Sequence, residues 1–467
     1  MTGQRELAQR LRAELGADAV ITDPEVTASY SRDMMPLAPN GRPLAVVLPS
    51  SATHVQLVVR ACAEAGVPIV PRGAGSGLSG AANAIDGCVS LVMTRMNEIL
   101  EIDADNRLAV VQPGVVNLDF RTAVEKHGLF YPPDPSSYDW CTIGGNLSTN
   151  AGGLCCVKYG VTTDSVLGLD VVLADGELMH TGRRTVKGVA GYDLTKLFVG
   201  SEGTLGVITA ATVALRPLPQ APGTLVATFD DTASAGAAVS RVVREGMVPS
   251  LMEIMDANSI EAAERYLKTQ VGPDGGCAAL LLCQSDAGGE VATRELSAIE
   301  RMCADSGATM TYVTGDLAEG RMLLQARRVV LMALETYGGT WLTDDVCVPR
   351  TRIAELIAGC QRISAEVGLR IAVVGHAGDG NMHPTIVYDP TSQAEFSGAR
   401  RAFDEILAVG LSLGGTVTGE HGIGRIKREW LATEIGPVGM RTHRAIKAAL
   451  DPTNLFNPGS MFSMSEV

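Results

Sequence analysis

Residues 71–80 read PRGAGSGLSG and directly follow a predicted strand at residues 67–70. From residue 75 onward their glycines match the dinucleotide-binding pattern G-x-G-x-x-G, which requires a strand before it and a helix after it. Here residues 89–93 predict a second strand, and the intervening residues 81–87 are too few for a crossover helix. The sequence therefore disfavours a Rossmann-type site. Glycine N–H groups can still form a phosphate-binding nest without a helix.

Two further glycine-rich stretches follow in the same part of the chain. Residues 131–153 contain YPPDP, CTIGGN and AGG, and residues 200–209 read GSEGTLGVIT. Each stretch alone is compatible with ordinary turn chemistry. Because three such stretches occur close together, each flanked by strands, they predict one extended ligand that is lined by backbone. A flavin dinucleotide is a ligand of that kind.

The composition is that of a globular chain, with 467 residues, 46% hydrophobic and 19% charged. A formal net charge of −14 disfavours nucleic acid as a partner. The sequence contains no membrane-length apolar run and no secretion signal at its N-terminus. We therefore expect a cytoplasmic protein, with peripheral attachment to the inner face of the membrane left open. Its ten cysteines form no CxxC pair and lack iron–sulfur spacing, so we expect buried thiols.

Apolar periodicity divides the chain into two main parts. Strands and helices of mixed α/β type continue to residue 215, and the proline-rich residues 216–223 predict a linker. Residues 224–313 then give the order β-α-β-β-α-β of split βαβ type, and residues 343–411 give a similar order. The predicted domains are residues 1–219, an α+β domain at residues 220–425, and a C-terminal segment at residues 426–467.

Two polar, glycine-rich strings in the later part of the chain contain three of its seven histidines: GHAGDGNMHP at residues 375–384 and GEHGIG at residues 419–424. Residues seven apart on a straight strand face opposite sides, so His376 and His383 can share a ligand only if GDGN forms a turn. With Glu420 they would form a His₂-carboxylate set that suits Zn²⁺, Mn²⁺ or Fe²⁺. Ordinary loop histidines are the alternative interpretation.

The three glycine-rich stretches, in this order, resemble the PCMH-type (vanillyl-alcohol oxidase-like) FAD-binding domain over about residues 40–218. In particular they resemble its D-2-hydroxyacid dehydrogenase branch, which includes D-lactate dehydrogenases, the flavin subunit of glycolate oxidase and D-2-hydroxyglutarate dehydrogenases. The histidine strings and the C-terminal motifs DPTN and NPG extend the resemblance to nearly the whole chain. The implied fold is α+β: a PCMH-type FAD-binding domain of two α/β subdomains, a ferredoxin-like substrate (cap) domain, and a C-terminal tail that returns to the FAD domain.

The resemblance implies that FAD is bound non-covalently. Ser76 stands where some relatives have the histidine that attaches flavin, and attachment through Cys141 is disfavoured. The implied cofactor-binding residues lie in the glycine-rich stretches and near the C-terminus. They are Pro71, Arg72, Gly73, Ala74, Gly75, Ser76, Gly77, Leu78, Pro133, Asp134, Thr142, Ile143, Gly144, Gly145, Asn146, Ala151, Gly152, Gly153, Glu202, Gly203, Gly206, Val207, Ile208 and Asn457.

The resemblance also implies the roles of the polar residues. His376, His383 and Glu420 would bind a divalent metal, with Zn²⁺ favoured and Mn²⁺ or Fe²⁺ as alternatives. His421 would be the catalytic base. Arg327 would pair with the substrate carboxylate, for which a guanidinium is well suited; a solvated helix arginine is the alternative.

The implied reaction is FAD-dependent, metal-assisted oxidation of a D-2-hydroxy acid to the 2-keto acid (EC 1.1), with hydride transfer to flavin N5. The electrons would pass to an acceptor other than NAD: a quinone, a cytochrome, an electron-transfer flavoprotein or an iron–sulfur partner subunit. A homodimer is left open.

Two departures from the relatives that are specific for 2-hydroxyglutarate concern the substrate. Those relatives have a lysine shortly before an Asp-x-x-x-Pro string, where this chain has Thr343 before residues 345–349. They also have an asparagine two residues after the second metal histidine, where Thr385 stands. Both differences favour a small monocarboxylate, D-lactate or glycolate.

Four alternative functions remain open from the sequence. Two lie in the same fold: a D-2-hydroxyglutarate dehydrogenase, and a flavin oxidase for alcohols or sugars. The other two are a flavin-free metal-dependent hydrolase and a non-catalytic subunit that binds FAD.

Overall fold

The computed structural model describes residues 2–463, which fold into two compact units. Unit 1 contains the chain up to Gly152, Gly160–Leu218 and the residues from Glu420 onward. Unit 2 contains Gly153–Tyr159 and Pro219–Gly419. The chain thus passes into unit 2 within the proline-rich segment at residues 216–223. The sequence did not predict that residues 153–159, which include α6 (Cys156–Tyr159), would pack with unit 2.

The first sheet of unit 1 carries the strand that leads into PRGAGSGLSG. Its strands, in spatial order, are β1 (Val20–Ile21), β2 (Ala45–Val47), β4 (Val89–Val92) and β3 (Ile69–Arg72). β2, β4 and β3 are parallel, and β1 is antiparallel to β2. The crossover is α3 (Ala52–Ala65). A serine before an apolar stripe and a glycine after it predict the two ends of a helix, and the structure has Ser51 as the N-cap and Gly66 in the left-handed conformation. α1 (Thr2–Leu15) packs on α3, and α2 (Pro24–Ala28) follows β1.

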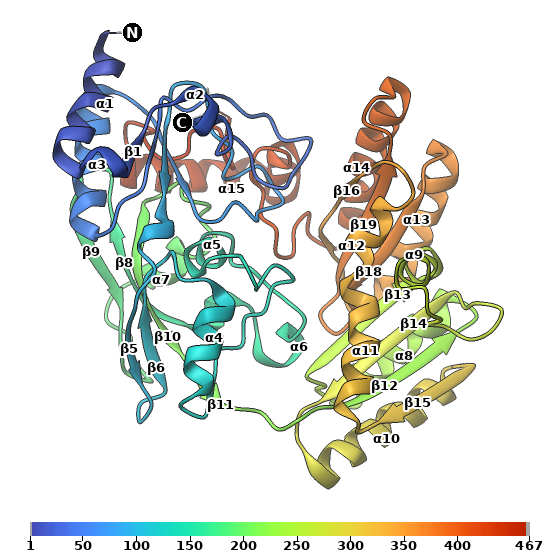
Figure 1. Ribbon diagram of the computed structural model, residues 1–467. Helices are drawn as coiled ribbons and strands as arrows, with labels where there is room; N and C mark the ends of the chain where they lie inside the picture. Colours follow the sequence, from blue (N-terminus) through green and yellow to red (C-terminus); the bar gives the residue numbers. More distant parts are fainter. Residues whose placement is uncertain (1, 464–467) are drawn as a thin grey trace. The chain divides into compact units, whose positions relative to one another are not determined.

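The second sheet of unit 1 is antiparallel throughout. Its strands, in spatial order, are β5 (Ile99–Asp103), β6 (Leu108–Val111), β10 (Val207–Ala214), β8 (Val166–Val172) and β9 (Leu178–Gly182). β5 and β6 form a hairpin, which the turn-forming residues Asp103, Asp105 and Asn106 between two apolar runs predict. The remaining elements are α4 (Asn117–Glu125), α5 (Ile143–Thr149), α7 (Leu194–Phe198) and the short pair β7 (Leu129–Phe130) and β11 (Arg216–Pro217) (Figure 1).

The C-terminal segment returns to the first sheet, as predicted. α15 (Arg428–Leu450) is kinked at Gly436, which precedes Pro437. The tail then forms a parallel bridge to the outer edge of β3: the Ile69 N–H donates to Leu455 O, and the Asn457 N–H donates to Ile69 O, each at 2.8 Å. The tail therefore supports the strand that carries PRGAGSGLSG.

Unit 2 is built on one antiparallel sheet of eight strands. Its first half consists of β12 (Gly223–Phe229), α8 (Thr232–Arg244), β13 (Leu251–Asp256), α9 (Ala257–Leu267), β14 (Ala279–Ser285), α10 (Gly289–Asp305) and β15 (Met310–Thr314). The spatial order β15-β12-β14-β13 is ferredoxin-like and confirms the predicted fold class, with α9 added between β13 and β14.

The second half of unit 2 extends the same sheet. Its elements are α11 (Leu317–Arg328), α12 (Val330–Glu335), β16 (Thr340–Thr343), β17 (Val346–Cys347), α13 (Ile353–Val367), β18 (Ile371–His376), β19 (Asn381–Tyr388) and α14 (Gln393–Ser412). β18 pairs with β13, and β19 lies between β18 and β16. The sequence pattern of residues 343–348 predicts one continuous strand, which is wrong because Asp344 and Asp345 separate β16 from β17. Both side chains are buried in the break.

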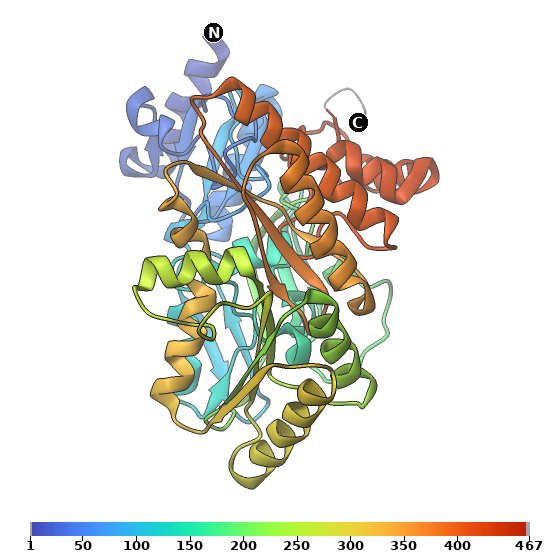
Figure 2. The same ribbon diagram turned by 90° about the vertical axis from the view of Figure 1, so that its right-hand side faces the viewer.

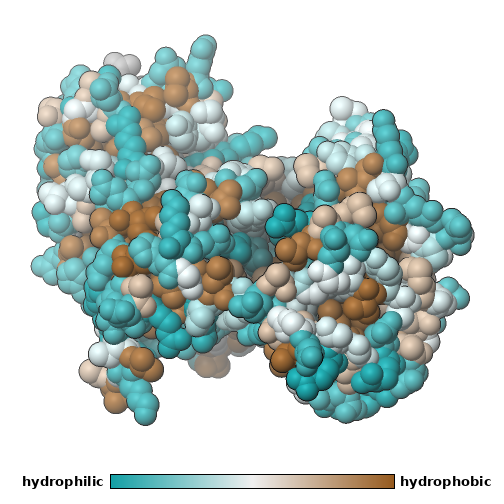
Figure 3. Space-filling view, turned by 60° about the horizontal axis from the view of Figure 1, so that its bottom comes forward, coloured by the Kyte–Doolittle hydropathy of each residue, from teal (hydrophilic) through white to brown (hydrophobic). Residues whose placement is uncertain are grey.

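Helices cover both faces of the sheet in unit 2. α9, α11 and α12 pack on one face, and α8, α10, α13 and α14 pack on the other (Figure 2). No helix among residues 2–463 combines the length and the hydropathy that a membrane span needs. On the face shown in Figure 3, hydrophobic residues lie in small groups between hydrophilic ones.

The tail of unit 1 is held by a buried ion pair, which can be tested. Lys447 is 2% exposed and pairs with Asp451, and its ammonium also donates to Thr204 O and Phe456 O. We expect Asp451→Ala to lower the free energy of unfolding by about 3–5 kcal/mol, because it leaves a buried charge without its partner. Urea titration followed by tryptophan fluorescence measures the loss.

The matched control removes an exposed pair with the same i,i+4 spacing. Glu366→Ala breaks the pair with Arg362, whose side chain is 57% exposed. We expect a change of about 0.5 kcal/mol or less. Equal losses in the two variants would contradict a structural role for the buried pair.

Candidate active site

The PRGAGSGLSG segment of unit 1 is braced by two buried side chains. The Arg72 guanidinium donates to Ala82 O at 3.2 Å and to Arg32 O at 3.0 Å. It lies directly beneath Gly75, where a Cβ would approach Arg72 Nη2 to 2.0 Å, and the φ of Gly75 is +87°. Asp33 accepts the N–H of Gly80 at 2.8 Å. Burial raises the pKa of Asp33 to about 6.

The N–H groups of this segment are available to a ligand. Within the part of the chain that the structure describes, the backbone N–H groups of residues 74–78 donate no hydrogen bond to protein. Residues 73–78 are all partly exposed. Consecutive N–H groups in a glycine-rich turn form an anion-binding nest. The segment therefore fits a pyrophosphate, as the sequence predicts.

The three glycine-rich stretches meet in unit 1 because glycines allow close backbone approach. A Cβ on Gly73 would lie 2.3 Å from Thr142 Oγ1 at the start of α5, and a Cβ on Gly203 would lie 3.1 Å from Pro71 Cγ. The Gly200 N–H donates to Leu147 O at 2.9 Å. This arrangement fits one extended cofactor such as FAD, because one surface combines the phosphate nest with the other two stretches.

The other predicted cofactor residues lie on the same elements or next to them. Thr142 is the N-cap of α5, which begins with Ile143, Gly144, Gly145 and Asn146. Pro133 and Asp134 precede α5, and Ala151 and Gly152 follow it. Gly206 precedes β10, and Val207 and Ile208 begin that strand. Gly153 belongs to unit 2. Asn146 is 4% exposed. Its side-chain amide donates a hydrogen bond to Cys141 Sγ and accepts one from the Asn117 side-chain amide. In this structure the Asn146 side chain therefore links the start of α5 to Cys141 and to α4.

Glu202 and Asn457 also make internal bonds, and together they hold the segment that follows His421. The Glu202 carboxylate accepts the N–H of Ile423 at 2.6 Å and the N–H of Gly424 at 2.7 Å. The Asn457 amide donates to Glu202 O at 2.8 Å. Glu202 and Asn457, both predicted cofactor residues, thus form a bracket: a pair of side chains that supports the backbone of residues 421–424 through hydrogen bonds.

The two histidines of unit 2 lie on the same face of the sheet. GDGN forms the turn between β18 and β19, as predicted. His383 pairs with Val374 in the register of these strands, and His376 is two residues from Val374. Residues two apart on a strand share a face, so the imidazoles are diagonal neighbours. Their ring centroids are 5.2 Å apart.

A buried carboxylate joins His376 to Arg327. Glu253 on β13 is directly opposite His376 in the strand register, and its Oε1 is 2.6 Å from His376 Nδ1. Its Oε2 accepts a hydrogen bond from Arg327 Nε at 2.7 Å. The sequence analysis missed Glu253. Its signal in the sequence is a single charged residue inside the otherwise apolar stretch LMEIM of β13.

A second buried carboxylate lies near His383. Asp345 Oδ1 is 3.8 Å from His383 Nδ1, and Asp345 Oδ2 accepts hydrogen bonds from Thr418 Oγ1 at 2.6 Å and the Gly419 N–H at 2.9 Å. Each imidazole therefore has a carboxylate on its Nδ1 side. For His376 this leaves Nε2 as the ligand atom for a metal. At 3.8 Å Asp345 does not fix the ring of His383, so either nitrogen of His383 can serve as a ligand atom, and the donor set of unit 2 fits a divalent cation.

Glu420 and His421 belong to unit 1. Glu420 packs against Gly152, where a Cβ would lie 2.4 Å from Glu420 Oε2. His421 Nε2 is 3.8 Å from Glu420 Oε1. The two predicted functional residues are therefore neighbours in space as well as in sequence, and the glycine after α5 makes room for the carboxylate.

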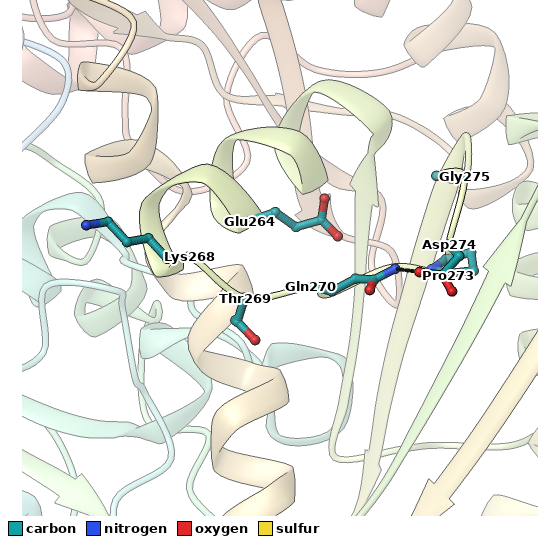
Figure 4. A pocket seen from close by; sticks show the side chains of 8 residues that line it. Glu264, Lys268, Thr269, Gln270, Pro273, Asp274 and Gly275 are labelled. Carbon is teal, nitrogen blue, oxygen red and sulfur yellow. Dashed lines mark hydrogen bonds between the residues drawn. The ribbon is translucent and has the colours of Figure 1, made fainter.

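The surface hollow in Figure 4 lies elsewhere in unit 2, next to the C-terminal end of α9, and contains none of the predicted site residues. Its polar groups stabilise their own segment. Glu264 accepts the N–H groups of Val271 and Gly272, and Gln270 donates to Asp274. We assign no function to it.

Comparison with known proteins identifies the family of this chain. A model of the FAD binding domain matches residues 43–182, and a model of the C-terminal domain of FAD linked oxidases matches residues 218–461. The glycolate oxidase subunit GlcD of Bacillus subtilis is 42% identical over 93% of this chain and 92% of its own length. D-lactate dehydrogenase of Anaerostipes hadrus is 34% identical over 96% of this chain and 95% of its own length.

Among solved structures, p-cresol methylhydroxylase with bound substrate is similar with a TM-score of 0.82 and 22% identity, over 100% of this chain and 98% of that one. At that identity the likeness shows the fold alone. Fold and site together define a flavoprotein with a PCMH-type FAD-binding domain and a ferredoxin-like second unit. The chain belongs to the FAD-linked oxidase family, in the branch of these two relatives, and is an FAD-linked oxidoreductase.

The bracket behind residues 421–424 predicts a pH dependence. Burial raises the pKa of Glu202 from 4.5 to about 7. In that interval the folded protein keeps a proton that the unfolded chain has lost. The stabilisation is therefore complete below pH 4.5 and is lost as the pH rises through 7. The loss is on the order of 3 kcal/mol.

Glu202→Gln removes this titration, so we expect its melting temperature to change less between pH 5 and pH 8 than that of the wild type. Asp33 and Asp256 shift in the same direction and are present in both proteins, so the comparison isolates Glu202. Differential scanning fluorimetry at four pH values measures the difference. Parallel pH profiles would contradict the assignment.

Proposed function

We propose that the protein oxidises a small D-2-hydroxy acid, glycolate or D-lactate, to the 2-keto acid, with FAD and a divalent metal, Zn²⁺ favoured and Mn²⁺ or Fe²⁺ as alternatives. The observation that carries the proposal is that His383, His376 and Arg327 lie next to one another on one face of the sheet in unit 2. There two imidazoles suited to a metal lie next to a guanidinium suited to a carboxylate. A 2-hydroxy acid presents a hydroxyl and a carboxylate on adjacent carbons, so it can engage both groups.

The metal would be held by His376, His383 and Glu420. Glu420 directly follows Gly419, whose N–H donates to Asp345 in unit 2. Glu420 would supply the carboxylate of this ligand set. Two histidines and one carboxylate leave coordination positions open for substrate. The metal supplies Lewis acidity, which makes a hydroxyl proton easier to remove.

Arg327 would hold the substrate carboxylate. It is buried, and Glu253 is the one hydrogen-bond partner of its guanidinium among the described residues, through Nε. The two terminal amino groups therefore remain for a carboxylate, which they can bind in bidentate fashion. Fixing that carboxylate would orient the Cα–H bond of the substrate. FAD, when bound, would supply the hydride acceptor.

His421 would take the hydroxyl proton as general base. Imidazole titrates near neutrality, so it can accept a proton at physiological pH. The bracket of Glu202 and Asn457 fixes the backbone immediately after it. The names of the two relatives, a glycolate oxidase subunit and a D-lactate dehydrogenase, support the same substrate class.

The proposal extends to the electron acceptor and the cellular location. The expected acceptor is other than NAD: a quinone, a cytochrome, an electron-transfer flavoprotein or an iron–sulfur partner subunit. We propose a cytoplasmic location, with peripheral attachment to the membrane and homodimer formation left to experiment. Family membership favours an oxidoreductase over a flavin-free hydrolase. A non-catalytic FAD subunit is separated from an enzyme by the first experiment below.

An anaerobic visible spectrum tests the proposed chemistry. We expect the flavin absorbance of the purified protein to bleach with D-lactate or glycolate, and not after EDTA treatment. We expect His421→Asn to bleach at least a hundredfold more slowly, since general bases contribute about 10²–10⁴-fold. His180→Asn, at an exposed histidine paired with Asp170, is the matched control and should behave as wild type. A yellow wild-type protein that ignores both acids would contradict the substrate class.

The substrate side of the site predicts a specificity. Thr385, on the same face as His383, donates to Thr343 Oγ1 at 3.1 Å, and both side chains are buried. This pair provides no positive charge for a second carboxylate. We expect kcat/KM for D-lactate or glycolate to exceed that for D-2-hydroxyglutarate at least tenfold in steady-state assays.

The variants Thr343→Lys and Thr343→Met separate charge from size. Both variants introduce a long side chain, but only lysine carries a positive charge that can pair with a second carboxylate. We therefore expect only Thr343→Lys to raise kcat/KM for D-2-hydroxyglutarate relative to that for D-lactate or glycolate. A wild-type enzyme that prefers D-2-hydroxyglutarate tenfold would establish the alternative function instead.

A further inference from the structure

Glu253 is a fully buried carboxylate in the middle of a sheet. It lies on β13 with 0% exposure, between β14 and β18. Leu251 and Met255, its neighbours on the same face of the strand, belong to the apolar core under α9, α11 and α12. Moving a carboxylate into such a place costs several kcal/mol before its partners compensate. A leucine there would pack like its neighbours, so the charge calls for an explanation.

The two oxygens of Glu253 have separate partners. Oε1 is 2.6 Å from His376 Nδ1, and Oε2 is 2.7 Å from Arg327 Nε. Among residues 2–463 these two side chains are the hydrogen-bond partners of the Glu253 carboxylate. A buried ion pair is weak evidence for stability. Both partners, however, are groups to which the proposed function gives a ligand.

We propose that Glu253 is a positioning residue that orients the metal-binding imidazole of His376 and the substrate-binding guanidinium of Arg327 at the same time. The inference rests on the proposed function and extends it to a residue outside the metal and substrate shells. Accepting the Nδ1 proton of His376 leaves the Nε2 lone pair for the metal. Accepting the Nε proton of Arg327 turns its two terminal amino groups towards a carboxylate.

The strand register makes this arrangement rigid. Glu253 and His376 are directly opposite each other on β13 and β18, so their Cβ atoms are about 4.5–5.5 Å apart. Arg327 is in the last turn of α11, which packs on the same face. One carboxylate therefore fixes the separation between the metal site and the carboxylate receptor. That separation must match the two adjacent functional groups of a 2-hydroxy acid.

Glu253→Gln tests the inference through metal binding, which needs no turnover. An amide has one accepting oxygen and one donating nitrogen, so it cannot accept from both partners. We expect the affinity of the FAD-loaded protein for Zn²⁺ to fall 10–100-fold in competition with a chromophoric chelator. With Zn²⁺ restored to saturation, we expect KM for the hydroxy acid to rise more than kcat falls, because Arg327 is less well oriented.

Asp256→Asn is the matched control. Asp256 lies on the same strand, is 1% exposed, and accepts hydrogen bonds from Ser259, at the start of α9. We expect this variant to lose stability but to keep the wild-type affinity for Zn²⁺. If Glu253→Gln does not retain FAD, Glu253→Asp, which keeps the charge but shortens the reach, replaces it with the same expectation.

The outcomes separate this inference from the proposed function. A wild-type protein that binds one Zn²⁺ and oxidises hydroxy acids, together with a Glu253→Gln variant of unchanged Zn²⁺ affinity and KM, would overturn the inference alone. An equal loss of affinity in Asp256→Asn would reduce Glu253 to a structural role and also overturn it. A wild-type protein that binds no divalent metal would overturn both.

Discussion

Close backbone approach is the constraint on which the cofactor side of this protein depends. The glycine-rich stretches of unit 1 can share one surface only because certain positions have no Cβ: Gly73 lies against Thr142, and Gly75 lies above Arg72. A methyl group at either place would collide with its neighbour. The N–H groups of residues 74–78 then remain for an anionic ligand, since the chain gives them no partner among the described residues.

In unit 2 the corresponding constraint is the register of an antiparallel sheet. Pairing of β13 with β18 and of β18 with β19 aligns Glu253, His376 and His383 on one face. Apart from the short turn between β18 and β19, the ladder of main-chain hydrogen bonds fixes the positions of these groups. Sites built on strands are more rigid than sites built on loops, which suits chemistry that depends on a fixed distance between two binding groups.

Much of this was predictable from the sequence, for identifiable reasons. Ser51 and Gly66 mark the ends of α3 because helix caps are local chemistry. The ferredoxin-like order of unit 2 follows from strand and helix periodicity, and GDGN predicted the turn that brings His376 and His383 to one face. The break at Asp344 and Asp345 was missed because the buried sequence around it has the apolar pattern of one strand.

Two buried carboxylates have contacts that the sequence could not reveal, because these contacts are with other parts of the protein. Glu253 stands in LMEIM, where hydropathy predicts only a strand. Its role is seen only from its contact with His376 on β18, more than a hundred residues further along the chain. Glu202 lies in a recognisable motif, but its carboxylate supports residues 423–424 from behind. Motifs indicate groups that meet a ligand. Residues that position these ligand-binding groups are found only when the register of the strands and the packing of the loops are known. In this protein Glu253 and Glu202, both buried carboxylates, are of that kind.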